Sequence, residues 1–391
     1  MIVGFDGTIL KGPKTGIGYY TYFLTIFLQR HHAEIDVRIF DGLRMRELGT
    51  EETVSDRRGA RSLGWKDALL RHVRKIEAAR RLKRILKAAS FRHASRGVEL
   101  HHATNFLPPA PISIPVLPLI HDVSHIRHPE WHPAERVRWL EERTAEFTDA
   151  PLINTVSHFS AGEIAATLGI EPHRVHVTYP GVNPVYRGEG SDERILVSSY
   201  DVAWGEFFLC VGALEPRKNL ATVIASYLEL PQQIQSRFPL LVVGPPGWGD
   251  LALPKGSENL QRRGALRFLG YVEETRMRAL YRGCTAFLFP SSYEGFGMPV
   301  SEAMATGTRP VVARGGAPEE VAGPAGMSCE AFDTQAWRMA MLQAIDEKWH
   351  SNGALRDQLR EASKRFRWKA NAEATRKLYD LCLSETGRAS S

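Results

Sequence analysis

Short apolar runs that alternate with helical patterns narrow the folds open to this sequence more than any other feature. The runs are rich in Val, Ile, Leu and Phe. They cover residues 2–5, 37–40, 98–101, 116–120, 152–156 and 175–178 in the first half, and 207–211, 240–243, 268–269, 286–289 and 310–313 in the second. Helical patterns lie between most of them, as over 19–29, 134–147 and 157–168. Apolar strands that alternate with helices indicate parallel sheets covered on both faces, so we predict an α/β protein with two doubly wound domains.

The boundary between the two domains is expected over residues 181–204. Turn and linker signals gather there, among them Pro180-Gly181, Asn183-Pro184 and Gly188-Glu189-Gly190-Ser191. A chain of 391 residues is too long for one ordinary core, which also favours two domains. Domains of this type bind ligands at the carboxyl ends of their strands, here in the cleft between them. Residues 357–383 are expected to form one long helix.

Charge and cysteine content limit the classes of protein to which this chain can belong. The net charge of +6 comes from one segment, residues 57–96, where fourteen Lys and Arg face only Asp67 and Glu77. The four cysteines are far apart, which argues against a disulfide framework and a structural zinc site. We find no secretion signal and no run of 18 apolar residues. We therefore expect a cytoplasmic protein.

The segment after the apolar run 286–289 carries the strongest functional signal. It reads Glu294-Gly-Phe-Gly-Met-Pro-Val-Ser-Glu302, and Gly307 follows. The glycines allow close backbone approach, and a helix that opens after such a loop presents free N–H groups suited to a pyrophosphate. Two carboxylates at this place suit sugar hydroxyls better than phosphate. The alternative is a helix cap with two solvated glutamates.

A second loop supports the first. After the run 207–211 the chain reads Gly212-Ala-Leu-Glu-Pro-Arg217-Lys218-Asn-Leu, again at a strand end that opens a helix. Cationic side chains there can bind a diphosphate and stabilise it as a leaving group. Taken alone, the pattern also fits a solvated helix start in which Glu215 pairs with Lys218.

Together the two motifs resemble glycosyltransferase family four. The spacing of Glu294 and Glu302 matches the E-x7-E signature of retaining glycosyltransferases, and E-P-R-K-N lies upstream as it does in the family. The N-terminal half matches in places: 15–20, 121–133, 156–160 and 180–184. The resemblance implies the GT-B fold, with two Rossmann-like domains facing each other across a cleft. We expect an acceptor-binding domain over 1–195, a donor-binding domain over 196–370, and a helix over 371–391 that packs back on the first domain.

The resemblance also implies roles for individual residues. The implied catalytic residues are Glu294, which would hold the donor sugar, His121 beside the transferred sugar, and Arg217 and Lys218 on the diphosphate. The implied donor-binding residues are Gly16, Gly18, Gly270, Tyr271, Val272, Phe296, Gly297, Met298, Pro299 and Glu302. Glu302 would bind the ribose, and 270–272 the base. Many relatives carry an additional Arg where this chain has Ala213, so the diphosphate would rest on Arg217 and Lys218.

Two weaker signals have alternative interpretations. Gly16-x-Gly18 follows an apolar run but lacks the third glycine of a dinucleotide fingerprint, so a plain turn is the default. His121, His125, His128 and His132 have spacings that could place metal ligands on one helix face. Pro129 interrupts such a helix, and we interpret the stretch as a loop in the cleft. No D-x-D signature stands in a suitable loop, so we expect neither a metal nor another cofactor.

The basic segment 57–96 also has more than one interpretation. Apolar residues at helical spacing are interleaved with its cations, which is typical of a helix on an anionic membrane surface. Packing of the apolar face on its own domain is the alternative. Nucleic-acid binding is not expected, because only Trp65 and Phe91 could stack on bases.

The predicted function is retaining transfer of a hexose from a nucleotide diphosphate sugar to a lipid-linked glycan or polysaccharide. The stretch 125–132 resembles enzymes that use GDP-mannose or related sugars to build bacterial surface polysaccharides, including lipopolysaccharide. Two alternatives stay open: a sugar-nucleotide epimerase on the same fold, and a non-catalytic partner subunit that binds nucleotide or lipid.

Overall fold

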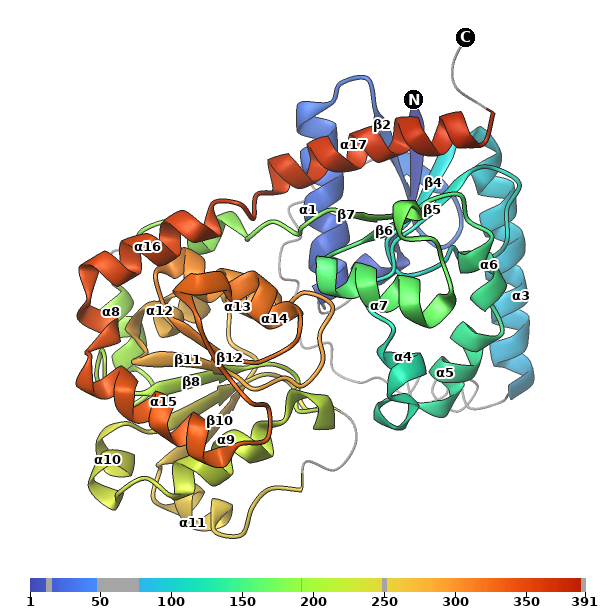
Figure 1. Cartoon of the computed structure of the whole chain (residues 1–391). Coiled ribbons are helices and arrows are strands. Elements are labelled where there is room, and N and C mark those ends of the chain that lie inside the picture. Colours follow the sequence, from blue (N-terminus) through green and yellow to red (C-terminus); the bar gives the residue numbers. More distant parts are fainter. Residues whose placement is uncertain (12–15, 48–76, 191, 248–251, 388–391) are drawn as a thin grey trace, which may run out of the picture.

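The computed structural model describes residues 1–391 except 12–15, 48–76, 191, 248–251 and 388–391. Its helices and strands form two α/β domains (Figure 1). All strand pairs in the described part of the chain are parallel except one antiparallel pair at an edge of the first sheet. Mostly parallel sheets with helical connections were the arrangement expected from the sequence.

The N-terminal domain is built on a five-stranded sheet in the order β3-β2-β1-β4-β5. Its strands are β1 (Ile2–Asp6), β2 (Asp36–Phe40), β3 (Met45–Glu47), β4 (Leu100–Ala103) and β5 (Val116–Pro118). A further parallel pair, β6 (Ile153–Thr155) and β7 (Val175–Val177), joins it through a single bridge between Leu119 and Asn154. The sequence analysis did not predict β3, which has three residues, two of them charged.

The helices of this domain connect the strands. They are α1 (Gly16–His31), α3 (Glu77–Ala94), α4 (Ser124–Arg127), α5 (Ala134–Glu141), α6 (Thr144–Thr148) and α7 (His158–Leu168). Single 3-10 turns are η1 (Gly7–Leu10), η2 (Ser95–Gly97), η3 (Pro129–Trp131) and η4 (Pro172–Arg174). One helix was predicted over 134–147, and that prediction is wrong at residues 142–143, where α5 ends and α6 has not begun.

The C-terminal domain contains a six-stranded parallel sheet in the order β10-β9-β8-β11-β12-β13. Its strands are β8 (Phe208–Val211), β9 (Leu240–Val243), β10 (Leu266–Gly270), β11 (Ala286–Phe289), β12 (Pro310–Ala313) and β13 (Met327–Cys329). Successive residues of one strand enter different cores: Phe208 and Cys210 pack on one face, and Leu209 on the other. Burial on both faces explains why these strands are apolar throughout.

Helices cover both faces of this second sheet. They are α8 (Glu193–Ser198), α9 (Leu220–Leu228), α10 (Gln232–Arg237), α11 (Ser257–Arg262), α12 (Glu274–Gly283), α13 (Met298–Thr306), α14 (Ala317–Ala322), α15 (Thr334–Asp346) and α16 (Gly353–Ser363). The 3-10 turns are η5 (Pro184–Tyr186), η6 (Pro216–Lys218), η7 (Gly323–Ala325) and η8 (Trp349–Ser351). The last helix, α17 (Trp368–Glu385), leaves this domain and lies along α1 of the other (Figure 1).

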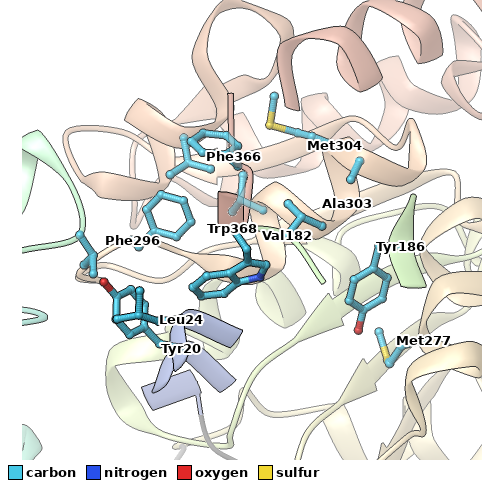
Figure 2. Packing of buried hydrophobic residues seen from close by; sticks show 14 of the residues in the cluster. Tyr20, Leu24, Val182, Tyr186, Met277, Phe296, Ala303, Met304, Phe366 and Trp368 are labelled. Carbon is cyan, nitrogen blue, oxygen red and sulfur yellow. The ribbon is translucent and has the colours of Figure 1, made fainter. Parts of the chain in front are cut away.

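The chain crosses between the domains twice, and the two crossings lie side by side. Val182 N–H donates to the carbonyl of Phe366 at 3.1 Å. A Cβ on Gly181 would lie 2.3 Å from the backbone nitrogen of Trp368, so only glycine fits at that contact. Figure 2 shows Trp368 packed near Tyr20 and Leu24 of α1. The crossings thus form part of a core shared by both domains.

One long helix over residues 357–383 was predicted, and that prediction is wrong. The chain forms α16 and α17 with a break at 364–367. At the break the Phe366 ring packs against the rings of Phe296 and Tyr179, at 5.3 and 5.6 Å between centroids. Arg367 then has an extended backbone. This turn lets the last helix pass from one domain to the other.

The basic segment is described only in part, because residues 57–76 lie outside the described residues. In α3 the Phe91 side chain is fully buried and meets the Phe40 ring at 5.1 Å. Ile85 and Leu86 on the same helix are 56% and 60% exposed. One part of the apolar face therefore packs on the domain and another faces outward. No helix in the described ranges is both long enough and apolar enough to cross a membrane.

Candidate active site

The loop after β11 and the start of α13 form the centre of the candidate site. Gly297 has φ 93°, in the left-handed region that favours glycine, and Pro299 lies in the first helical turn. Gly307 ends the helix with φ 82°. No described side chain caps the first turn of α13, and that turn contains no acid. Its N–H groups and the positive end of its dipole can thus accept an anion.

Three of the predicted site residues meet in one ion cluster. Glu294 accepts hydrogen bonds from Arg217 Nη1 at 2.9 Å, from Lys218 Nζ, and from Ser291 Oγ at 2.6 Å. Arg217 Nε also donates to Glu215 at 2.9 Å, so its guanidinium bridges two carboxylates. The cations follow β8 and Glu294 follows β11. These strands are neighbours in the sheet, which brings their carboxyl ends together.

The electrostatics of this cluster keep the Glu294 carboxylate ionised at neutral pH. Burial acts to raise the pKa of Glu294, but Arg217 and Lys218 outweigh it and hold that pKa at about 2. Burial acts to lower the pKa of Arg217, and the attraction of Glu294, Asp122 and Glu215 raises it above its ordinary value. Burial lowers the pKa of Lys218, which Glu294 offsets only in part. The site presents an ionised carboxylate between cationic side chains.

The second predicted carboxylate, Glu302, lies in a different environment one turn into α13. The Tyr281 hydroxyl donates to Glu302 at 3.1 Å. Burial, followed by repulsion from Glu274, raises the pKa of Glu302 to about 8. Tyr19 of α1 also belongs here: burial, a hydrogen bond with Glu274, and the charges of Tyr271 and Glu302 raise its pKa. No ion pair among the described residues joins Glu302 to the cations of the Glu294 cluster.

The N-terminal domain places His121 against the donor loop. The His121 carbonyl lies so close to Gly295 that a Cβ on that glycine would be 2.1 Å away. His121 Nε2 donates to the Thr104 carbonyl at 2.9 Å, because a carbonyl oxygen can only accept. Burial lowers the pKa of His121, so its ring is neutral at pH 7. The ring can therefore still accept a hydrogen bond at Nδ1.

The other predicted donor-binding residues lie in three places. Gly16 and Gly18 open α1, and a Cβ on Gly16 would lie 3.9 Å from the Met298 sulfur, so the starts of α1 and α13 lie close together. Gly270 ends β10, Tyr271 and Val272 follow it, and the Tyr271 side chain is 52% exposed. Phe296 is buried, and its ring packs on Phe366, which makes it a core residue of the shared interface.

Contacts that the sequence did not predict hold the domains together beside this loop. Ser157 Oγ and Ser160 Oγ both donate to the Gly295 carbonyl, at 2.6 and 2.9 Å. Glu320 of α14 accepts from the N–H groups of His158 and Phe159, at 2.9 and 2.8 Å. A carboxylate at the N-terminus of α7 is stabilised by the helix dipole. The Val-Ser-His-Phe-Ser pattern could have suggested the helix start, but not its partner from the other domain.

The histidine stretch forms a loop with short helices rather than one helix. It folds as α4 and η3, and Ser124 Oγ lies 2.5 Å from Asp122 Oδ1 and 2.9 Å from His132 Nε2. His125 is buried, and its ring meets Phe106 edge-on at 5.9 Å. The described residues contain no group of three or more His, Cys, Asp or Glu side chains arranged to hold a metal ion.

Two family models match the chain, one in each domain. Glycosyltransferase Family 4 matches residues 15–186, and Glycosyl transferases group 1 matches residues 204–366. The O-antigen chain mannosyltransferase B of Escherichia coli is 32% identical over 376 residues, which are 95% of this chain and 97% of that protein. The chain belongs to glycosyltransferase family 4. The serotype-specific mannosyltransferase WbdA of Escherichia coli is 28% identical over 71% of the chain, a match that spans 34% of that longer protein.

Solved structures agree with this assignment at the level of the fold. The structure of HepE from Anabaena with UDP and glucose has a TM-score of 0.65 and 17% identity, and covers 97% of this chain and 98% of that one. WaaG, a glycosyltransferase involved in lipopolysaccharide biosynthesis, has a TM-score of 0.62 and 14% identity over the whole of both chains. The glycosyltransferase therefore has the GT-B fold that the motifs implied.

Within this family 4 glycosyltransferase the predicted residues form two groups rather than one. Glu294, Arg217 and Lys218 lie in the ion cluster, with His121 across the loop. Glu302 lies with Tyr281 and Glu274, toward the start of α1. The glycosyltransferase thus presents, along one stretch of loop and helix, a region of paired charges and a region of carboxyl and tyrosine side chains.

Proposed function

We propose that the chain is a retaining, metal-independent mannosyltransferase that uses GDP-mannose and extends a lipid-linked surface polysaccharide. One observation carries the proposal: Glu294 is held between Arg217 and Lys218, at the start of α13 and against His121. This arrangement provides cations for a diphosphate and a carboxylate for sugar hydroxyls within one cluster. The names of the two E. coli relatives support mannose as the sugar.

The proposed reaction breaks the bond between the anomeric carbon and the diphosphate oxygen. Arg217, Lys218 and the N–H groups of α13 stabilise the negative charge that develops on the departing diphosphate. The acceptor hydroxyl attacks the anomeric carbon from the same face, and its proton passes to the leaving phosphate. Glu294, ionised throughout, accepts hydrogen bonds from the sugar hydroxyls. His121 accepts one through its neutral ring.

The donor is tested first by thermal shift with GDP, UDP, ADP and TDP and their common sugar conjugates, with and without EDTA. We expect GDP and GDP-mannose to raise the melting temperature by several degrees, unchanged by EDTA. Product analysis by NMR should then show transfer to an α-mannoside acceptor with retained anomeric configuration. Conversion of the donor without acceptor would indicate an epimerase instead. Nucleotide binding without turnover would indicate a non-catalytic subunit.

We further propose that α3 attaches the enzyme to the anionic membrane surface that carries its acceptor. The exposed Ile85 and Leu86 of α3, in a segment with a large excess of Lys and Arg, support this. Flotation with anionic vesicles at low salt should recover the wild-type protein and lose the variant Ile85→Ser/Leu86→Ser. Ile195→Ser is the matched control, because Ile195 is 68% exposed on α8 of the other domain. Equal recovery of all three proteins contradicts the proposal.

A further inference from the structure

The N-terminal domain contains a hollow of about 370 Å³ that Phe106, a neighbour of His121, helps to line. Asn105 and Phe106, which follow β4, line one side, and Arg136 and Trp139 of α5 line another. Ile9 of η1 and Ile17 of α1 contribute apolar surface. The hollow thus lies at the carboxyl ends of β1 and β4, where doubly wound domains bind ligands. None of the four residues from β4 and α5 has a role in the ion cluster.

Phe106 is held in a strained conformation at this hollow. Its φ is 66°, and Leu107 N–H donates to the Asn105 carbonyl at 2.9 Å, which closes a tight turn around it. A bulky residue rarely adopts the left-handed region, and residues in such strained conformations cluster at ligand sites. The buried ring lies 6.1 Å from the His121 ring and 5.9 Å from the Arg136 guanidinium. It therefore connects the hollow with the proposed donor site.

Two polar side chains at the hollow, the half-buried Asn105 and the exposed Arg136, have no polar partner among the described residues. The Asn105 carboxamide and the Arg136 guanidinium form no hydrogen bond or ion pair with any other residue in the described ranges. Other cations nearby are paired: Arg143 donates to Glu146 at 2.6 and 2.7 Å. The Arg143 guanidinium also lies 5.1 Å from the Trp139 ring, which helps to fix that ring. Asn105 and Arg136 are thus available to a ligand.

We infer that this hollow binds a pyranose ring of the acceptor glycan. The apolar face of a sugar packs on aromatic rings such as Trp139 and Phe106, as other C–H surfaces do. Its hydroxyls can donate to the Asn105 carbonyl oxygen and accept from Arg136, which uses both polar groups. An alkyl chain would leave the half-buried Asn105 carboxamide unpaired against apolar surface, which is unfavourable, and would make no use of the exposed Arg136. This inference rests on the proposed function and assigns the place where its acceptor binds.

The test uses the full chain, saturated with GDP, and an α-linked mannobiose as the probe. We expect NMR titration to show mannobiose binding to the wild type and at least tenfold weaker binding to Arg136→Ala and Asn105→Ala. With octyl α-mannobioside as acceptor, these variants should raise the acceptor KM tenfold and leave the KM for GDP-mannose unchanged. Arg138→Ala is the matched control, since Arg138 is exposed on α5 as Arg136 is but does not line the hollow.

Several outcomes overturn the inference. The inference is wrong if both variants keep the wild-type affinity for mannobiose and the wild-type acceptor KM. It is also wrong if the wild type does not bind mannobiose at millimolar concentration. If octyl phosphate competes with octyl α-mannobioside and mannobiose does not, the hollow binds the lipid carrier instead. A thermal shift with GDP in every variant reports an intact fold and donor site. A wild type that binds no nucleotide contradicts the proposed function, whereas normal transfer with unaffected variants contradicts only this inference.

Discussion

Two glutamates eight residues apart lie in opposite electrostatic environments. At the loop end, Glu294 is surrounded by Arg217 and Lys218, which hold its pKa at about 2. At the helix end, Glu302 is half-buried near Glu274 and accepts a hydrogen bond from Tyr281, and its pKa is about 8. The same residue type is therefore an anion at one end and, below pH 8, an acid with a proton at the other. The comparison shows that spacing alone does not define the chemistry of this motif.

The difference matches the two ends of the proposed donor. The loop end would face the sugar and the diphosphate, where charge develops during transfer. The helix end would face the nucleoside, which is neutral and rich in hydroxyls. The predictions below test this division, beginning with the loop end.

The largest effect is expected from Glu294→Gln. The amide keeps the size of the side chain but removes the charge that pairs with Arg217 and Lys218. We expect kcat to fall about a thousandfold, within the range seen for loss of one preorganised electrostatic group. Steady-state kinetics would measure it, with Glu330→Gln as control because Glu330 forms an exposed pair with Arg314. A kcat within threefold of wild type would remove Glu294 from the proposed mechanism.

A smaller loss of activity is expected when Arg217, one of the cationic side chains of the cluster, is changed. Arg217→Lys keeps the charge but cannot bridge Glu294 and Glu215 through a planar fork. We expect kcat to fall about a hundredfold, together with a weaker thermal shift by GDP. The matched comparison is Arg237→Lys, whose arginine pairs with Glu206 on the exposed surface. If Arg217→Lys behaves like Arg237→Lys, the diphosphate is bound elsewhere.

At the helix end the expected effect depends on pH. If ribose hydroxyls donate to Glu302, GDP binding requires its ionised form. Affinity for GDP should then rise about tenfold for each pH unit as pH approaches 8, and level off above it. Calorimetry in buffers of different ionisation enthalpy should detect about one proton released on binding at pH 7. Glu302→Gln should abolish this dependence, and a wild type with a flat profile from pH 6 to 9 would argue against the role.

The stability of the protein without ligand should also depend on the raised pKa of Glu302. A carboxyl whose folded pKa exceeds its unfolded value binds a proton more tightly in the native state. Its contribution is fully present below the unfolded pKa of about 4.3 and is lost as pH rises to 8, by at most about 1.4 kcal/mol per unit. Glu302→Gln should therefore gain melting temperature relative to wild type between pH 5 and 8. A constant difference across that window would show that the carboxyl is not perturbed.

The smallest effect is expected from a third glutamate, Glu320, whose carboxylate contacts N–H groups and the Tyr179 hydroxyl rather than cations. Glu320→Gln should lower stability by about 1 kcal/mol, since only the charge at the start of α7 is lost. Chemical denaturation would measure this. Glu319→Gln, at the preceding residue of α14, is the control, and a larger loss of stability in the control would contradict the assignment.

The parallel strands were the best predicted part of the fold. The apolar runs 240–243, 286–289 and 310–313 coincide with β9, β11 and β12, because burial on both faces leaves a clear sequence signal. The helix break before Trp368 was missed, since it depends on packing of Phe366 against rings from both domains. Local helix propensity does not depend on such contacts between distant residues, so it cannot predict the break.

The candidate site was predicted as a set of residues but not as an arrangement. Motif spacing identified Glu294 and Arg217, which are 77 residues apart, yet their ion pair follows from the order of strands in the sheet. The environment of Glu302 depends on Tyr281 and Glu274, which belong to no motif. Asn105 and Arg136 carried no sequence signal, because single polar residues near a strand end or on a helix are common.

The return of α17 to the first domain has a consequence for biosynthesis. Its Tyr379 and Cys382 are fully buried, and the Tyr379 hydroxyl lies 2.9 Å from Nδ1 of His102 in β4. During translation, the N-terminal half emerges first but lacks this part of its core until the ribosome has made the entire second half. The core of the first domain therefore stays incomplete while the second domain, which is one continuous segment, folds. Nascent-chain proteolysis should find the late-made half resistant to cleavage before the early-made one.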